Sequence, residues 1–159
     1  AERASELNHS IRGALSEIRQ RTAKWPRRRM MFIVGRTPNT LEGLTAVGKA
    51  SYLNELIRIA GGENVFGDSL APYPQVTLEE VLARNPEVIV DMGDMAATEG
   101  VTPEQKRRVV ALWGRYPNLA AVRRRAVYAV ASDIFVVPGP RMVEAARAFA
   151  RMLHPEAGL

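Results

Sequence analysis

The chain has 159 residues, of which 47% are hydrophobic and 25% are charged, a composition that suits a single globular domain and excludes disordered and fibrous classes. It contains no cysteine, so disulfide bonds and thiolate metal sites are excluded. The net charge is +5, and no apolar run approaches the roughly 20 residues that a membrane-spanning helix needs.

Arginines form three clusters in the sequence, at 27–29, 107–108 and 123–125. Each cluster lies beside an apolar segment that reads as a strand or a helix, and none is interleaved with aromatic residues that would stack on bases. We interpret the clusters as solvated surface charge, with an anionic ligand or a membrane surface as the alternative. We predict no nucleic-acid partner.

The first predicted element is an amphipathic helix at residues 2–24, because apolar residues recur there at helical spacing among charged neighbours. A strand buried on both faces is predicted at 29–35. It is followed by a long loop at 36–50, of a kind that is usually functional in compact domains. Ser51 then caps a helix that ends at the glycine pair 61–62.

Prolines on both sides hold Tyr73 in an extended corner, because a proline biases the residue before it away from the helical region. Thr77 and Glu80 have the spacing of a capping box, which predicts a short helix directly after the corner. Three apolar residues are expected on the buried face of this helix: Leu78, Val81 and Leu82.

The second half of the chain continues the alternation of strands and helices. A buried strand is predicted at 87–93 and a further strand at 126–131. A helix that begins at Thr102 and Pro103 lies between them, and a closing helix starts at Arg141. This order predicts an α/β fold with a small parallel sheet, helices on both faces, and a long helix in front.

Ligands of open parallel sheets bind beyond the carboxyl ends of the strands. Four parts of this sequence follow strands or connect them, and we expect them to share one rim. They are residues 36–48, Tyr73, residues 91–98 and residues 132–141.

No enzyme constellation is visible at this rim. His9 and His154 fall in the first and last helices, where we predict surface positions, so a histidine triad or metal cluster is not expected. The glycine-rich dinucleotide motif and the P-loop are absent. Asp133 lies among apolar residues where a polar group would reach a ligand. We predict no catalytic residue, no metal site and no cofactor. The other rim carboxylates are interpreted as caps or solvated groups: Glu42, Asp91, Asp94 and Glu99.

Three stretches occur in a familiar order and spacing: "VGKASYLNELIRIAGGENVFGDS", "YPQVTLEEVLARNPEVIV" and "VYAVASDIFVVPGPRMVEAARAFARMLHPE". Together they resemble the C-terminal lobe of the vitamin B12 and ferric-siderophore class of periplasmic substrate-binding proteins of ABC importers, over nearly the whole chain. The resemblance implies that residues 1–26 are the latter part of a helix joining two lobes and that 27–159 form the C-terminal lobe. The N-terminal lobe and a signal peptide would lie upstream, with export to the periplasm or lipid anchoring outside the cell.

The resemblance also implies ligand contacts in a cleft between the lobes. Tyr73 matches a cleft tryptophan, Asp133 matches a cleft aspartate, and Thr45 falls where the B12 binder has a cleft phenylalanine. For an anionic ferric siderophore, Arg36 and Arg141 would supply charge-assisted hydrogen bonds.

Glu79 matches a surface glutamate that docks onto arginines of the permease in this family. The implied ligand is a large metal chelate. Siderophores are placed ahead of corrinoids, because a cleft arginine of the B12 binder aligns with Val137, and haem is third, because no tyrosine–histidine pair suited to haem iron is visible. An isolated lobe with an uncovered helix face is also a candidate for homodimerisation. The alternatives are a chelatase-like enzyme domain that uses rim carboxylates and a freestanding interaction domain.

Overall fold

The computed structural model describes residues 2–93, 100–131, 134–135 and 139–159. Its helices are α1 (Glu2–Thr22), α2 (Tyr52–Ile59), α3 (Leu78–Arg84), α4 (Pro103–Trp113), α5 (Ala120–Arg123) and α6 (Arg141–Leu153), with a short 3-10 helix η1 (Pro155–Ala157). Its strands are β1 (Arg28–Gly35), β2 (Thr45–Ala46), β3 (Gly62–Asn64), β4 (Val88–Asp91) and β5 (Val127–Ala129). No helix within these described ranges is both long and apolar enough to cross a membrane.

One sheet runs in the order β2-β1-β4-β5, and β3 also pairs with β1. The pairs β1–β3, β1–β4 and β4–β5 are parallel, as expected from the alternation of strands and helices. The α/β class is confirmed, with one difference: β2 adds an antiparallel strand, so the sheet is mixed. Strands β2 and β3 have two and three residues, which is too short for a hydrophobic period to reveal them in sequence.

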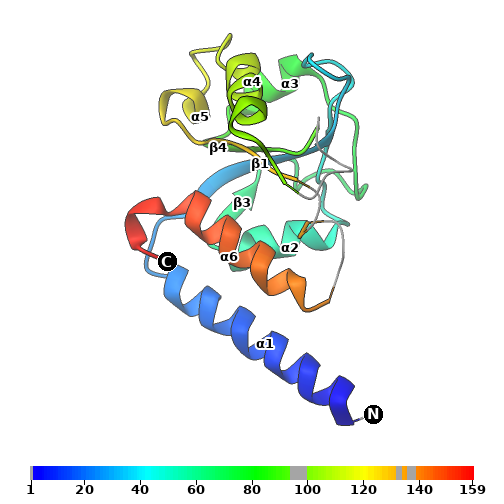
Figure 1. Cartoon of the computed structure of the whole chain (residues 1–159), viewed down its shortest axis with the longest axis vertical. Coiled ribbons are helices and arrows are strands. Elements are labelled where there is room, and N and C mark those ends of the chain that lie inside the picture. The colour runs from blue at the N-terminus through cyan, green and yellow to red at the C-terminus, as the bar shows by residue number, and fades with distance from the viewer. Residues whose placement is uncertain (1, 94–99, 132–133, 136–138) are drawn as a thin grey trace.

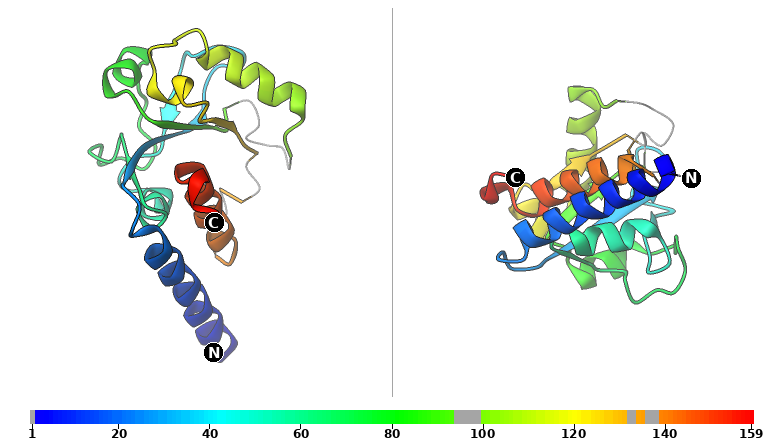
Figure 2. Two further views of the ribbon diagram at one scale, coloured as in Figure 1. Left: turned by 90° about the vertical axis from the view of Figure 1, so that its left-hand side faces the viewer. Right: turned by 90° about the horizontal axis from the view of Figure 1, so that it is seen from below.

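Helices cover both faces of the sheet (Figures 1 and 2). Successive residues of β1 point to opposite faces, so Met30 and Phe32 join one core while Met31 and Ile33 join the other. The first core is closed by α1, α2 and α6, and the second by α3, α4 and α5. Helix α1 is the outermost layer on its side and lies along α6 and α2 (Figure 1).

Two burial expectations were wrong. Leu82, expected on the buried face of α3, is 38% exposed, because α3 is only seven residues long and Val81 alone faces the core fully. His154, expected on the surface, is fully buried. Its Nε2 lies 3.3 Å from the carbonyl oxygen of Gly61, and its ring stacks on Trp25 at a centroid distance of 6.3 Å. The turn after α1 and the turn after α2 therefore cover the end of α6.

Candidate functional site

The corner that carries Tyr73 is held by backbone hydrogen bonds to the segment that contains β2. The Ala46 and Gly48 amides donate to the carbonyl oxygens of Pro74 and Pro72, each at 2.9 Å. In the reverse direction the Val76 amide donates to the carbonyl oxygen of Leu44 at 2.9 Å. The carbonyl groups of the two prolines thus accept hydrogen bonds from the β2 segment. These bonds hold the corner to that segment on both sides of Tyr73.

Gly48 lets the two segments approach this closely. A Cβ atom at this position would lie 2.2 Å from the carbonyl oxygen of Ala71 and 2.8 Å from Cδ of Pro74. Both distances are far below van der Waals contact, so any side chain here displaces the corner. The sequence predicts a long functional loop at this point, and the structure shows that its glycine serves as a backbone contact.

Tyr73 is 46% exposed on this corner, which agrees with its expected presentation to solvent. Its neighbour is Tyr52, the first residue of α2, whose hydroxyl donates to the carbonyl oxygen of Phe135 at 2.6 Å. Burial raises the pKa of Tyr52 above its ordinary value, and the nearby Tyr73 raises the pKa further. Sequence reasoning did not find Tyr52; the signal was an aromatic residue opening a helix directly after a rim loop.

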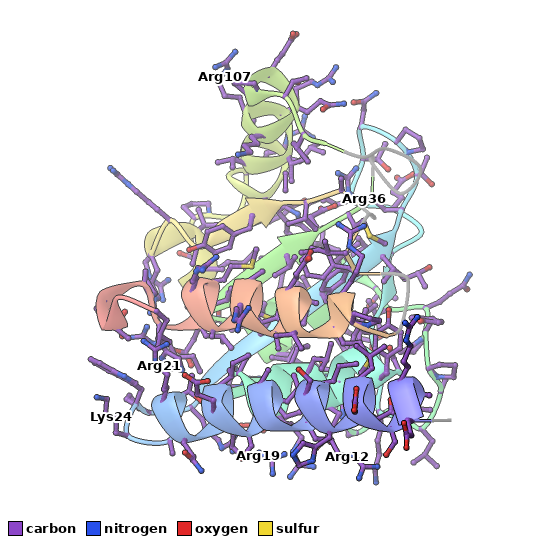
Figure 3. The ribbon with its side chains drawn as sticks, turned by 60° about the horizontal axis from the view of Figure 1, so that its bottom comes forward. Arg12, Arg19, Arg21, Lys24, Arg36 and Arg107 are labelled. Carbon is purple, nitrogen blue, oxygen red and sulfur yellow. The ribbon has the colours of Figure 1, made fainter. Side chains whose placement is uncertain are left out.

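Arg36 and Asp91 lie at the carboxyl ends of β1 and β4, but both side chains are completely buried. Arg36 Nε donates to both carboxylate oxygens of Asp91, at 3.2 and 3.0 Å. Trp113 Nε1 donates to Asp91 Oδ2 at 2.7 Å, and the Gly93 amide donates to Oδ1 at 2.7 Å. The expectation that Arg36 faces the ligand is therefore corrected. Its guanidinium pairs with the Asp91 carboxylate inside the domain, and this pair with Trp113 connects β1, β4 and α4. Figure 3 labels Arg36 beside the sheet, beneath α4.

The remaining predicted contacts are distributed differently. Thr45, in β2, is partly buried and bridges to Gln75, two residues from Tyr73, so the structure brings these two candidates together. Arg141 opens α6, is exposed, and lies 3.5 Å from Glu144 Oε2. Asp133 lies outside the described residues. No cluster of histidine, aspartate or glutamate suited to a metal ion occurs in the described parts of the chain.

Helix α3 places Glu79 on the surface, six residues beyond Tyr73. Thr77 caps this helix: its hydroxyl accepts from the Glu80 amide at 3.1 Å, and its own amide donates to Glu80 Oε1 at 3.3 Å. The predicted capping box is confirmed. Because the cap uses the Glu80 carboxylate, the exposed Glu79 carboxylate is left to solvent or to a partner.

A profile of the family described as "Periplasmic binding protein" matches residues 1–134. The chain belongs to the periplasmic binding protein family.

Curated relatives and solved structures agree with this membership. The vitamin B12-binding protein of Salmonella typhimurium is 32% identical over 146 residues, which cover 92% of this chain and 48% of that protein. The structure of an ABC-type Fe3+-hydroxamate transport system from Saccharomonospora viridis is 27% identical, with a TM-score of 0.78, and the match covers 95% of this chain and 49% of that one. The vitamin B12 binding protein BtuF of Vibrio cholerae is 25% identical, with a TM-score of 0.69 and coverage of 94% and 52%.

This periplasmic binding protein chain spans about half the length of the relatives it matches. The resemblance seen in the sequence is therefore confirmed at the level of the family. Within the family's fold, the described residues bring Tyr73, Thr45 and Tyr52 to one region of the strand rim, while Arg36 belongs to the interior.

Proposed function

We propose that this chain is the C-terminal lobe of an exported, two-lobed binding protein that delivers a large metal chelate to an ABC importer. Residues 1–26 would be the latter part of the helix that joins the lobes, and residues 27–159 would form one wall of the cleft. Two findings support this: the chain matches half of the length of its relatives, and α1 lies as an outer helix along one side of the domain.

The observation that carries the proposal is the presentation of Tyr73. Its ring is about half exposed on a corner whose backbone is bonded on both sides. A tyrosine has only two side-chain torsions to restrict, so a preordered ring loses little entropy when a flat ligand covers it. A macrocycle or a planar chelate has a flat surface that can be buried against the Tyr73 ring.

The ligand class is inferred from the relatives and from the charges near the rim. Relatives include vitamin B12-binding proteins and an Fe3+-hydroxamate transport protein. We rank ferric siderophores slightly above corrinoids and place haem third. Arg141, exposed at the start of α6, and Asp133 are the proposed polar contacts, and Thr45 lines the cleft beside Tyr73.

Docking to the permease is proposed through Glu79. Its position in the first turn of α3 leaves the carboxylate in solvent, while the adjacent Glu80 is used by the cap. An exposed carboxylate on a capped helix suits a cationic pocket on a partner, since a helix amino end tolerates negative charge before and after docking. The periplasm, or the outer face of the membrane for a lipid-anchored form, would be the location.

The first test is a calorimetric titration of the complete two-lobed protein with cyanocobalamin and with a ferric hydroxamate. Tyr73→Ala should weaken binding of the preferred chelate by about 1–3 kcal/mol, as expected for a lost aromatic contact, whereas Tyr73→Phe should retain it. Leu70→Ala is the matched control, because Leu70 lies in the same segment and is 78% exposed. Affinity that is unchanged in Tyr73→Ala for every chelate would contradict the proposed cleft.

The second test separates binding from delivery. Glu79→Arg should leave chelate affinity unchanged and reduce uptake by cells that depend on the importer. Glu104→Arg is a close control, because Glu104 occupies the same second position of a helix with a capping box, α4, and undergoes the same charge reversal. Normal transport by the Glu79 variant would remove the docking role.

A further inference from the structure

Strand β5 forms one edge of the sheet, opposite the edge that carries β2 and β3. The Ile89 amide donates to the carbonyl oxygen of Ala126, and the Val130 amide donates to the carbonyl oxygen of Asp91. In a parallel pair this pattern directs the backbone groups of Val127 and Ala129 away from β4. No strand in the described part of the chain pairs with that outer side. Within the described ranges, the outer side of β5 is therefore an unpaired edge of the sheet.

A mostly apolar groove lies against this edge, with a volume of about 320 Å³. It is lined by Val110, Gly114, Val122, Arg125 and Val127. Val110 lies on α4 and Gly114 is the C-cap of this helix, one helical turn further on. Val110 is 46% exposed although it is a large apolar residue. An open strand edge beside an apolar groove is the arrangement that binds an extended peptide by strand addition, with one side chain in the groove.

Positive charge surrounds this edge. Arg107 lies three residues before Val110 on the same side of α4, and Arg125, which lines the groove, is also exposed. Arg124 is paired with Glu87 at 2.8 Å, but neither Arg107 nor Arg125 has a carboxylate within ion-pair distance among the described residues. The proposed function uses neither the 107–108 cluster nor the 123–125 cluster.

We propose that the β5 edge and its groove bind an acidic, extended polypeptide segment. The open backbone groups would form the added strand, a small apolar side chain would occupy the groove, and acidic neighbours would meet Arg107 and Arg125. A second copy of this chain is disfavoured as the occupant, because pairing two β5 edges would bring the arginine clusters of both copies together. An anionic lipid surface or a polynucleotide would also attract the arginines, but neither has the backbone groups to hydrogen-bond the strand edge.

The test uses a fluorescein-labelled peptide with alternating residues, Glu-Val-Glu-Val-Glu-Ala-Glu, titrated by fluorescence anisotropy at low ionic strength. The chain should bind it saturably and should not bind the counterpart in which lysine replaces glutamate. Arg107→Glu should weaken binding by at least about fivefold, because it reverses a charge beside the groove. Arg12→Glu is the matched control: it makes the same charge change on α1, on the far side of the molecule (Figure 3).

Two further variants separate strand addition from charge attraction. Val127→Pro removes an outward-facing amide without touching the bonds to β4, and should weaken binding by about three- to tenfold. Val110→Glu places a carboxylate in the groove on an exposed helix position and should have at least the effect of Arg107→Glu. Circular dichroism of each variant establishes that it is folded before titration.

Four outcomes would overturn the proposal. They are absence of peptide binding, equal losses in Arg107→Glu and Arg12→Glu, full binding by both Val127→Pro and Val110→Glu, and preferential binding of phosphatidylglycerol vesicles or a single-stranded oligonucleotide over the peptide. A dimer in sedimentation that Arg107→Glu strengthens would instead assign the edge to a second copy. Chelate titrations address a separate rim, so a failure here leaves the proposed function standing.

Discussion

The Tyr73 corner and the Arg36–Asp91 pair lie at the same end of the sheet but are positioned by opposite means. The corner is ordered by main-chain hydrogen bonds, and its side chain is left half exposed. The pair is ordered by its own side chains, which are completely buried with Trp113. A segment that is ordered by backbone hydrogen bonds keeps its side chain available for a ligand. A side chain that is itself buried and bonded to hold the fold is not available for one.

This comparison also shows which parts of the site could be predicted. Paired prolines determine backbone shape within a few residues, so the exposure of Tyr73 followed from local sequence. The burial of Arg36 depends on Asp91 and Trp113, which are 55 and 77 positions away in the sequence. No local sequence pattern predicts that these three side chains contact one another. The capping box of α3 was predictable for the same reason as the corner.

The fold follows the same division between local and distant information. The parallel strands β1, β4 and β5 carry apolar runs, and β1 and β4 are buried in the centre of the sheet, which a sequence pattern reveals. Strands β2 and β3 exist only because β1 offers an edge to each of them. His154 is buried by the turns after α1 and α2, contacts between distant parts of the chain that its own neighbours do not encode.

The largest effect is expected from breaking the buried pair. Asp91→Ala removes the carboxylate that pairs with the buried Arg36 side chain and that accepts from Trp113. We expect a loss of about 3–5 kcal/mol in the free energy of unfolding, measured by urea denaturation. Asp68→Ala is the control, because it breaks an exposed pair with Arg84 that solvent screens, and it should change the free energy of unfolding far less. Equal losses would mean that the two pairs contribute alike.

A smaller effect is expected from disturbing the corner through its backbone. Gly48→Ala places a Cβ atom against Ala71 and Pro74 and should lower the free energy of unfolding by about 1–3 kcal/mol. Amide exchange at Ala46 and Val76 should accelerate, since their bonds hold the corner. Gly35→Ala is the control, because its Cβ would meet no atom within 4 Å. Unchanged exchange in Gly48→Ala would show that the corner tolerates separation.

His154 is a buried titratable side chain whose hydrogen bonding differs from that of Asp91. Its Nε2 lies near the Gly61 carbonyl oxygen, but its Nδ1 has no hydrogen-bond partner among the described residues. Burial lowers the pKa of His154; the nearby Arg28 and Arg124 lower it as well, while the Gly61 carbonyl and Glu156 act against this. The neutral ring is thus favoured in the folded state, and stability present above the unfolded pKa is lost as the pH falls through the folded value.

We therefore expect the free energy of unfolding to fall below about pH 6.5, with a slope of at most ~1.4 kcal/mol per pH unit from this group. The measurement compares urea denaturation of the wild-type chain and His154→Gln between neutral and mildly acidic pH. The difference in stability between the two proteins should shrink as the pH falls. A difference that is independent of pH would remove His154 as the titrating group.

The smallest effect is expected at the junction of the corner and α3. Thr77→Ala removes the hydroxyl that accepts from the Glu80 amide and should cost about 0.5–2 kcal/mol of stability. Thr77→Ser should restore most of it, because the hydroxyl is retained. If Thr77→Ala also alters amide exchange at Val76, the cap and the corner behave as one unit; if exchange is unaffected, they are independent.

The backbone between Tyr73 and Glu79 is held at two positions. Val76 is buried and bonded to the segment before it, and Thr77 anchors the first turn of α3. These two anchors connect the Tyr73 corner to the start of α3 through the backbone. Under the proposed function, the exchange measurement on Thr77→Ala therefore also tests whether ligand binding at Tyr73 is coupled to docking at Glu79.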